Sequence, residues 1–126
     1  MQSALFDYSA ENVALTTTPD VIQFLIDLVG NDPKVLDKEQ IAKDVFNREK
    51  VSSTLLLNTD IVLPHAKTTG LMGMLTGIVT LKAPISFDGT DKLARTFILV
   101  IASPDMIKPY LKKLSMIANI FGYKNV

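Results

Sequence analysis

Over residues 19–29, apolar side chains cover most of the circumference of a helix. Pro19 suits the first helical position, so the pattern predicts Thr18 as the N-cap, and Gly30 is expected to end the helix. The narrow polar side of this helix consists of Asp20, Gln23 and Asp27. A helix with so little polar surface is expected to be largely buried.

Two further helices are predicted to bury one apolar stripe each. Asp37 is expected to cap a helix over residues 38–49, whose outer face is charged. A last helix is predicted over residues 109–121, with Pro109 at its first position and Gly122 after its end. Its three- and four-residue spacing predicts a core stripe of Leu111, Leu114, Ile117, Ala118 and Phe121.

Two longer segments have the pattern of strands. Residues 74–81 alternate between two faces, and Pro84 is expected to close this strand because proline cannot donate to a ladder. Residues 95–102 are apolar on both faces. This is typical of a central strand in a sheet that is covered on both sides.

Shorter apolar patches complete the predicted sheet. Brief strands are expected at residues 54–57 and 61–63, and patches at residues 4–8 and 12–15, separated by a polar break, predict an edge strand or a hairpin. With the helices, these elements predict an α/β fold. The expected architecture is a single domain, residues 1–126, with helices on both faces of a mixed β-sheet, an α/β/α sandwich.

The composition narrows the class of protein. Thirteen basic residues balance thirteen acidic ones, so no positive excess favours nucleic acid. The absence of cysteine excludes a thiolate metal site and a cysteine nucleophile within this chain. The longest apolar run, residues 97–102, is much shorter than the about 20 residues of a membrane span, and the N-terminus lacks the pattern of a signal peptide. We therefore expect a soluble cytoplasmic protein with no direct membrane insertion and no nucleic-acid partner.

The single histidine, His65, is the first candidate for chemistry. It follows a short apolar strand that Pro64 is expected to end, and sites tend to lie near strand ends. A neutral imidazole is nucleophilic near physiological pH, although a histidine beside an apolar strand is more often a packed or capping residue. One histidine without cysteine makes a transition-metal site a poor hypothesis, and neither a glycine-rich phosphate loop nor a G-x-S-x-G elbow occurs. No metal or cofactor is expected.

A longer motif around His65 resembles a known family. The segments Asn47-Arg48-Glu49-Lys50, Ser53-Thr54 and Ile61-Val62-Leu63-Pro64-His65 resemble the mannitol/fructose-type EIIA domain of the bacterial phosphotransferase system. That family has R-E-x-x-x-S/T-T followed by I-A-[IV]-P-H. The likeness spans most of the chain and continues through residues 77–81, 87–89 and 97–102 and the last helix.

The resemblance implies a phosphoryl-carrier domain, a phosphotransferase component with a phosphohistidine intermediate. His65 would accept a phosphoryl group from phospho-HPr on Nε2 and pass it to a cysteine of a separate EIIB domain. Arg48 matches the family's active-site arginine, whose planar fork suits phosphoryl oxygens, whereas the commoner fate of such an arginine is a solvated charge at a helix end. Thr54 and Tyr110 are expected in the substrate-binding part of this site.

Three departures from the family pattern bear on activity. Tyr110 stands where the family usually has a second histidine that contacts the phosphoryl group. The segment from Thr54 to His65 is one residue longer than usual and lacks the usual glycine. The chain stops at Val126, shortly after the last helix, whereas family members usually continue with further helical structure.

These departures leave other functions open. In the main alternative, the chain is an EIIA-like regulatory module, for example of a transcriptional regulator, in which phosphorylation of His65 is a signal. A third possibility is a scaffold that keeps the fold without being phosphorylated. An apolar ring for HPr docking is a further hypothesis, with a core position expected for at least one of its members, Leu71, Met72 and Met74.

Overall fold

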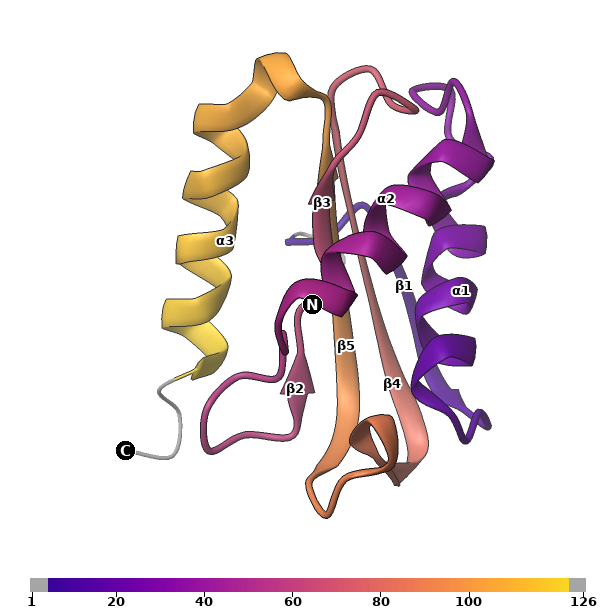
Figure 1. Ribbon diagram of the computed structural model, residues 1–126, viewed down its shortest axis with the longest axis vertical. Helices are drawn as coiled ribbons and strands as arrows, with labels where there is room; N and C mark the ends of the chain where they lie inside the picture. The colour runs from indigo at the N-terminus through magenta and orange to yellow at the C-terminus, as the bar shows by residue number, and fades with distance from the viewer. Residues whose placement is uncertain (1–4, 123–126) are drawn as a thin grey trace.

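The computed structural model describes residues 5–122, which form three layers (Figure 1). Helices α1 (Thr18–Val29) and α2 (Lys38–Val51) cover one face of a five-stranded sheet, and α3 (Ile107–Gly122) covers the other. The strands are β1 (Tyr8–Val13), β2 (Ile61–Val62), β3 (His65–Lys67), β4 (Met74–Ser86) and β5 (Leu93–Ala102). Short 3₁₀ turns are η2 (Phe87–Gly89) and η3 (Pro104–Met106). The predicted α/β/α sandwich with a mixed sheet is confirmed.

Strand β5 lies at the centre of the sheet. It pairs antiparallel with β4 on one side, while β2 and β3 pair with it in parallel, one after the other, along its other side. Strand β1 completes the sheet as a parallel neighbour of β4. Residues 97–102 of β5 are all fully buried. This confirms the prediction of an apolar strand between two covered faces.

Strands β1 and β4 each run through a position where the sequence pattern predicts a break. The polar break does not interrupt β1, because exposed Ser9 and Glu11 alternate with half-buried neighbours on one edge strand, and the hairpin alternative is wrong. Ala4, the first residue of the predicted patch, lies outside the described residues. Strand β4 continues through Pro84. Its register with β5 shifts between Thr80 and Ile85, so the ladder does not require an N–H from the proline.

A turn replaces the strand predicted at residues 54–57. An isolated bridge joins Leu55 to Val62, and Asn58 adopts a left-handed conformation with φ of 62°. Asparagine tolerates this conformation better than most residues do. The turn brings Thr54 beside Leu63, whose N–H donates to the Thr54 carbonyl over 3.0 Å.

The helix starts depend on side-chain caps and on tertiary contacts. Asp37 caps α2 as predicted, because its carboxylate accepts from the Gln40 N–H over 3.1 Å. The cap of α1 is Thr17, and the prediction of Thr18 is wrong. The Thr18 hydroxyl instead accepts a hydrogen bond of 3.0 Å from the N–H of Asp88, in the turn that follows β4.

The predicted core stripe of α3 is confirmed at Ile117, whereas its first position, Leu111, is exposed. The helix begins at Ile107, two residues before Pro109, whose missing N–H has no intrahelical partner in the first turn. Tyr110 is 5% exposed whereas Leu111 is 54% exposed, so the predicted core position at this end is wrong by one residue. Tyr110 and Ile117 are buried against the face of the sheet that α1 and α2 leave open.

Candidate functional site

His65 is the first residue of β3, directly after the interruption that Pro64 makes between β2 and β3. Both short strands pair with β5, so one neighbour holds the backbone on either side of Pro64. His65 lies opposite Val100, whose N–H donates to the Pro64 carbonyl over 3.1 Å. The sequence pattern placed His65 beyond the end of a strand. Its position inside the sheet leaves the backbone little freedom.

The imidazole has a defined hydrogen bond to the backbone. Nδ1 of His65 lies 2.6 Å from the carbonyl oxygen of Leu63. A carbonyl oxygen can only accept, so Nδ1 carries the proton and Nε2 of the neutral ring keeps a lone pair. Burial lowers the pKa of His65; the bond to Leu63 opposes this, and the charge of Arg48 adds to it. The neutral, nucleophilic form is therefore favoured.

A cavity of about 340 Å³ opens beside His65. Three elements contribute to its lining: α2 through Arg48, β3 through His65 and Lys67, and α3 through Tyr110. Helices α2 and α3 lie on opposite faces of the sheet (Figure 1), so the cavity lies at the β3 edge between the two helical layers. The remaining lining residues are Asp44, Ala66, Leu111 and Leu114. The structure thus brings together three of the four predicted site residues.

Arg48 lies in the last turn of α2 and is half-buried. Its Nη1 donates to the Ser52 hydroxyl over 3.4 Å, at the long end of hydrogen-bond distances. Within residues 5–122, the one ion pair joins Lys38 to Asp27 over 2.7 Å. No carboxylate in this range therefore neutralises Arg48 at ion-pair distance, and its planar fork remains available to an anion.

Tyr110 lines the cavity together with His65. The ring centroids are 6.3 Å apart and the ring planes are inclined by 48°. Burial raises the pKa of the Tyr110 hydroxyl, and the charge of Arg48 opposes this rise only in part. The phenol therefore stays neutral near pH 7. It brings a hydroxyl to the site but no positive charge.

Thr54 lies behind the site and does not line the cavity. It is 6% exposed, and its hydroxyl donates to Oε2 of Glu49 over 2.8 Å. Burial raises the pKa of Glu49, the Thr54 hydroxyl lowers it, and the neighbouring Asp88 raises it again. The Leu63 N–H in turn donates to the Thr54 carbonyl, and the Leu63 carbonyl accepts from Nδ1 of His65. Thr54 and Glu49 thus support the backbone that holds His65.

Sequence reasoning missed two charged residues of the cavity, Lys67 and Asp44. The signal for Lys67 was its spacing, because residues two apart in a strand lie on the same face. Asp44 lies one helical turn before Arg48, which is also a same-face spacing. Both signals became usable only once β3 and α2 were known to border one cavity.

The apolar ring expected after His65 is only partly exposed. Leu71 is 2% exposed and belongs to the core, as expected for at least one member. Met74 is half-buried against the second core cluster. Met72 is 66% exposed. Of the three, Met72 therefore presents the largest apolar surface.

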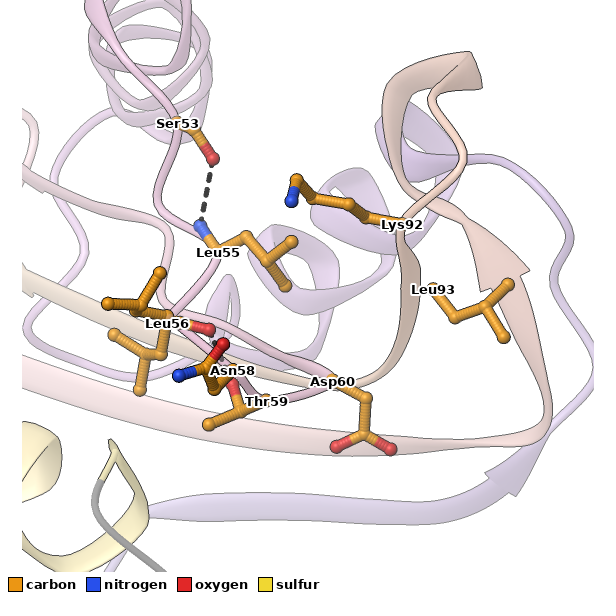
Figure 2. A pocket seen from close by; sticks show the side chains of 9 residues that line it. Ser53, Leu55, Leu56, Asn58, Thr59, Asp60, Lys92 and Leu93 are labelled. Carbon is orange, nitrogen blue, oxygen red and sulfur yellow. Dashed lines mark hydrogen bonds between the residues drawn. The ribbon is translucent and has the colours of Figure 1, made fainter. Parts of the chain in front are cut away.

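A larger cavity of about 710 Å³ lies at the other end of the sheet (Figure 2). Four leucines, Leu55, Leu56, Leu57 and Leu93, line it together with Lys92 and Asp60. Its Ser53 hydroxyl accepts from the Leu55 N–H, and its Thr59 hydroxyl donates to the Leu56 carbonyl, so both satisfy local backbone groups. It contains no imidazole and is not the candidate site.

Two features are absent from residues 5–122. No group of three or more His, Cys, Asp or Glu side chains could hold a metal ion. No helix in this range is long and apolar enough to cross a membrane.

Comparison with known proteins identifies the family. Residues 8–126 match the sequence model of the family described as "Phosphoenolpyruvate-dependent sugar phosphotransferase system, EIIA 2". The match covers nearly the whole chain, and the protein belongs to this family. Its EIIA domains act as phosphoryl carriers.

Individual relatives include regulatory and sugar-specific proteins. The nitrogen regulatory protein of Pseudomonas aeruginosa is 27% identical over 119 residues, which are 94% of this chain and 77% of the relative. The structure of IIA-Ntr from Neisseria meningitidis has a TM-score of 0.76 at 19% identity, covering 91% of this chain and 77% of that one. IIA mannitol from Escherichia coli has a TM-score of 0.69 at 18% identity, with coverages of 86% and 75%. These structures share the fold.

Proposed function

We propose that the protein is a phosphoryl carrier in the cytoplasm that accepts a phosphoryl group from phospho-HPr on Nε2 of His65 and passes it to a cysteine of an EIIB domain. One observation carries this proposal. The Leu63 carbonyl binds the Nδ1 proton of His65 over 2.6 Å, which leaves the Nε2 lone pair for attack. The half-buried ring and its lowered pKa keep that lone pair unprotonated.

The transfer is a displacement at phosphorus. The bond from Nε2 to phosphorus forms as the bond between the donor's histidine nitrogen and phosphorus breaks, and the donor nitrogen keeps that electron pair. Nδ1 of His65 retains its proton throughout. Such a transfer needs positioning and charge stabilisation more than covalent chemistry.

Arg48 supplies the charge stabilisation in this proposal. It lines the same cavity as His65 and forms no ion pair with a carboxylate of residues 5–122. Its guanidinium can bind two phosphoryl oxygens as charge spreads over them in the transition state. Tyr110, which also lines the cavity, donates one hydrogen bond.

A relative supports the assignment of an EIIB domain as the acceptor from His65. The E. coli complex of enzyme IIA mannitol with phosphorylated enzyme IIB mannitol includes a chain that shares this fold, with a TM-score of 0.67 at 17% identity over 86% of this chain and 76% of that one. By analogy, the surface around His65 would meet an EIIB domain. The absence of cysteine in this chain requires the acceptor cysteine to come from another module.

A second candidate function is regulation, in which the phosphorylated state of His65 is a signal. Tyr110 favours this alternative, because a neutral phenol offsets none of the charge that a phosphoryl group brings. The curated relative from P. aeruginosa is named a nitrogen regulatory protein. A regulator would accept phosphate from phospho-HPr but would not pass it on to an EIIB cysteine at a useful rate.

Incubation with phospho-HPr followed by intact-mass measurement tests whether His65 accepts the phosphoryl group. We expect one added phosphoryl group that is labile in acid and stable in base. His65→Gln should abolish the addition while circular dichroism shows an unchanged fold. A phosphoryl group retained by that variant contradicts the assignment. Chasing the phosphorylated protein with EIIB proteins then separates carrier from regulator.

A further inference from the structure

The cavity beside His65 contains a second cationic side chain, that of Lys67. His65 and Lys67 are the first and last residues of β3, and side chains two apart in a strand lie on the same face. The residue between them, Ala66, is 4% exposed, whereas Lys67 is exposed. This alternation places the lysine on the more solvent-exposed face that carries the imidazole.

The distance between the two positions suits a shared ligand. Two residues along a strand are separated by roughly 6.6 Å. A lysine has a flexible four-carbon stem that carries a compact charge with three donors. Such a side chain can reach back over its neighbour to a group attached to the imidazole ring.

The charges around Lys67 leave its ammonium available. Within residues 5–122 the ion pair is that of Lys38 with Asp27, so Lys67 has no carboxylate partner at ion-pair distance. Asp44 is the acidic residue in the cavity lining, and its Oδ1 accepts from Nε2 of Gln40 over 3.1 Å. A phosphoryl group on His65 would meet repulsion from Asp44. Arg48 and Lys67 are the two cations of the lining that can offset this repulsion.

We propose that Lys67 is a catalytic residue that binds a non-bridging oxygen of the phosphoryl group during its transfer to His65. This inference rests on the function proposed above. This role explains how the site can work without a second imidazole. Tyr110 lines the cavity as a neutral phenol, and Lys67 supplies from β3 the positive charge that the phenol lacks.

The step balances without a proton from Lys67. The bond from Nε2 of His65 to phosphorus forms while the donor's nitrogen–phosphorus bond breaks, and the donor nitrogen keeps the electron pair. The ammonium of Lys67 donates hydrogen bonds to a phosphoryl oxygen and keeps all its protons. Its contribution is charge and position, so a permanently charged replacement should preserve it.

Three variants of the full chain test this role. Lys67→Met keeps most of the side-chain length and removes the charge, whereas Lys67→Arg keeps the charge. Lys92→Met is the matched control, because Lys92 is also exposed but lines the cavity at the other end of the sheet (Figure 2). Single-turnover rates of phosphorylation by phospho-HPr are measured by rapid quench at limiting and at saturating donor concentrations.

We expect Lys67→Met to slow the saturating rate by roughly tenfold. This is less than the hundredfold typical of a buried electrostatic contact, because Lys67 is exposed to solvent. Lys67→Arg should recover most of the rate, and Lys92→Met should match the wild type. Adding Tyr110→His to Lys67→Met should restore part of the rate by returning a positive charge to the cavity.

The outcomes separate this inference from the function on which it rests. A wild type that gains no phosphoryl group on His65 overturns both. A phosphorylated wild type with an unchanged saturating rate in Lys67→Met overturns only the role of Lys67. A loss confined to limiting donor concentration also overturns it, because the lysine would then act in docking HPr and not in the transfer.

Discussion

Nδ1 of His65 lies 2.6 Å from the carbonyl oxygen of Leu63, two residues before it in the chain. Pro64 stands between them, and its ring restricts φ, so the link that sets this distance is stiff. The Val100 N–H also holds the Pro64 carbonyl in place from the central strand. The protein therefore selects one tautomer of its single histidine through the backbone.

The titration of His65 should be directly observable, because the chain has no other histidine. Burial lowers its pKa in the folded protein, so we expect a midpoint below the about 6.5 of an exposed histidine. Phosphoryl acceptance should stay level as the pH falls through 6.5 and decline only near the lower midpoint. Proton NMR of the imidazole resonances gives the midpoint, and a value at or above 6.5 contradicts the prediction.

The lowered pKa of His65 also makes the free energy of unfolding depend on pH. A pKa that is lower in the folded than in the unfolded state means that the unfolded chain binds more protons between the two values. The stability that neutral His65 contributes is therefore complete above about pH 6.5 and is lost as the pH falls toward the folded midpoint. Comparison with the His65→Gln variant over this range isolates the contribution.

Replacement of Arg48 should slow transfer more than it affects folding. Arg48→Ala removes a charge from the wall of the cavity, and we expect phosphoryl acceptance to fall roughly a hundredfold. Arg48→Lys should recover only part of the rate, because a point charge lacks the planar fork. Lys43→Ala, an exposed change in the same helix, is the control. Equal rates for Arg48→Ala and this control would mean that Arg48 is only a solvated charge at a helix end and takes no part in the transfer.

Introduction of a second imidazole should accelerate transfer. Tyr110→His replaces a neutral phenol, whose ring lies 6.3 Å from that of His65, with a side chain that can carry a positive charge. Rapid-quench kinetics with phospho-HPr should show faster acceptance and a longer-lived phosphorylated form. Tyr110→Phe is the matched control, since it keeps the buried ring and removes only the hydroxyl. If neither variant changes the rate, Tyr110 serves only the packing of α3.

Glu49 should make stability fall as the pH rises. Burial raises its folded pKa above the unfolded value, so its favourable contribution is present below the unfolded pKa and is lost as the pH rises through the folded pKa. Denaturant unfolding at a series of pH values should show this decline in the wild type but not in Glu49→Gln. Glu39→Gln, an exposed change in the same helix, should behave as the wild type does.

Loss of the Thr54 hydroxyl should affect both stability and transfer. Thr54→Val removes the 2.8 Å hydrogen bond to Glu49, which should cost about 1 kcal/mol of stability at neutral pH. Without its side-chain hydrogen bond, residue 54 is held less firmly, although its backbone carbonyl still accepts from the Leu63 N–H. Because Leu63 orients His65, we also expect a moderately slower transfer. A normal rate in this variant would confine Thr54 to a role in stability.

The sequence alone predicted those features that depend on residues close together in the chain. The apolar run at residues 97–102 predicted the central strand, because only a strand covered on both faces buries every side chain. Asp37 was recognisable as a cap because its carboxylate satisfies the N–H of Gln40, three residues away. The motif that contains Arg48 and His65 pointed to two residues that line one cavity.

Tertiary structure determined the role of each residue whose partner lies far away in the chain. Thr18 is not the cap of α1 because its hydroxyl binds Asp88, and Tyr110 replaces Leu111 in the core because the sheet lies on that side of α3. Thr54 contacts Glu49 instead of the cavity. Lys67 belongs to the site because residues of α2 and α3 line the same cavity at the edge of β3. Periodicity shows which side chains share a face, but the face that borders a site depends on the elements packed against it.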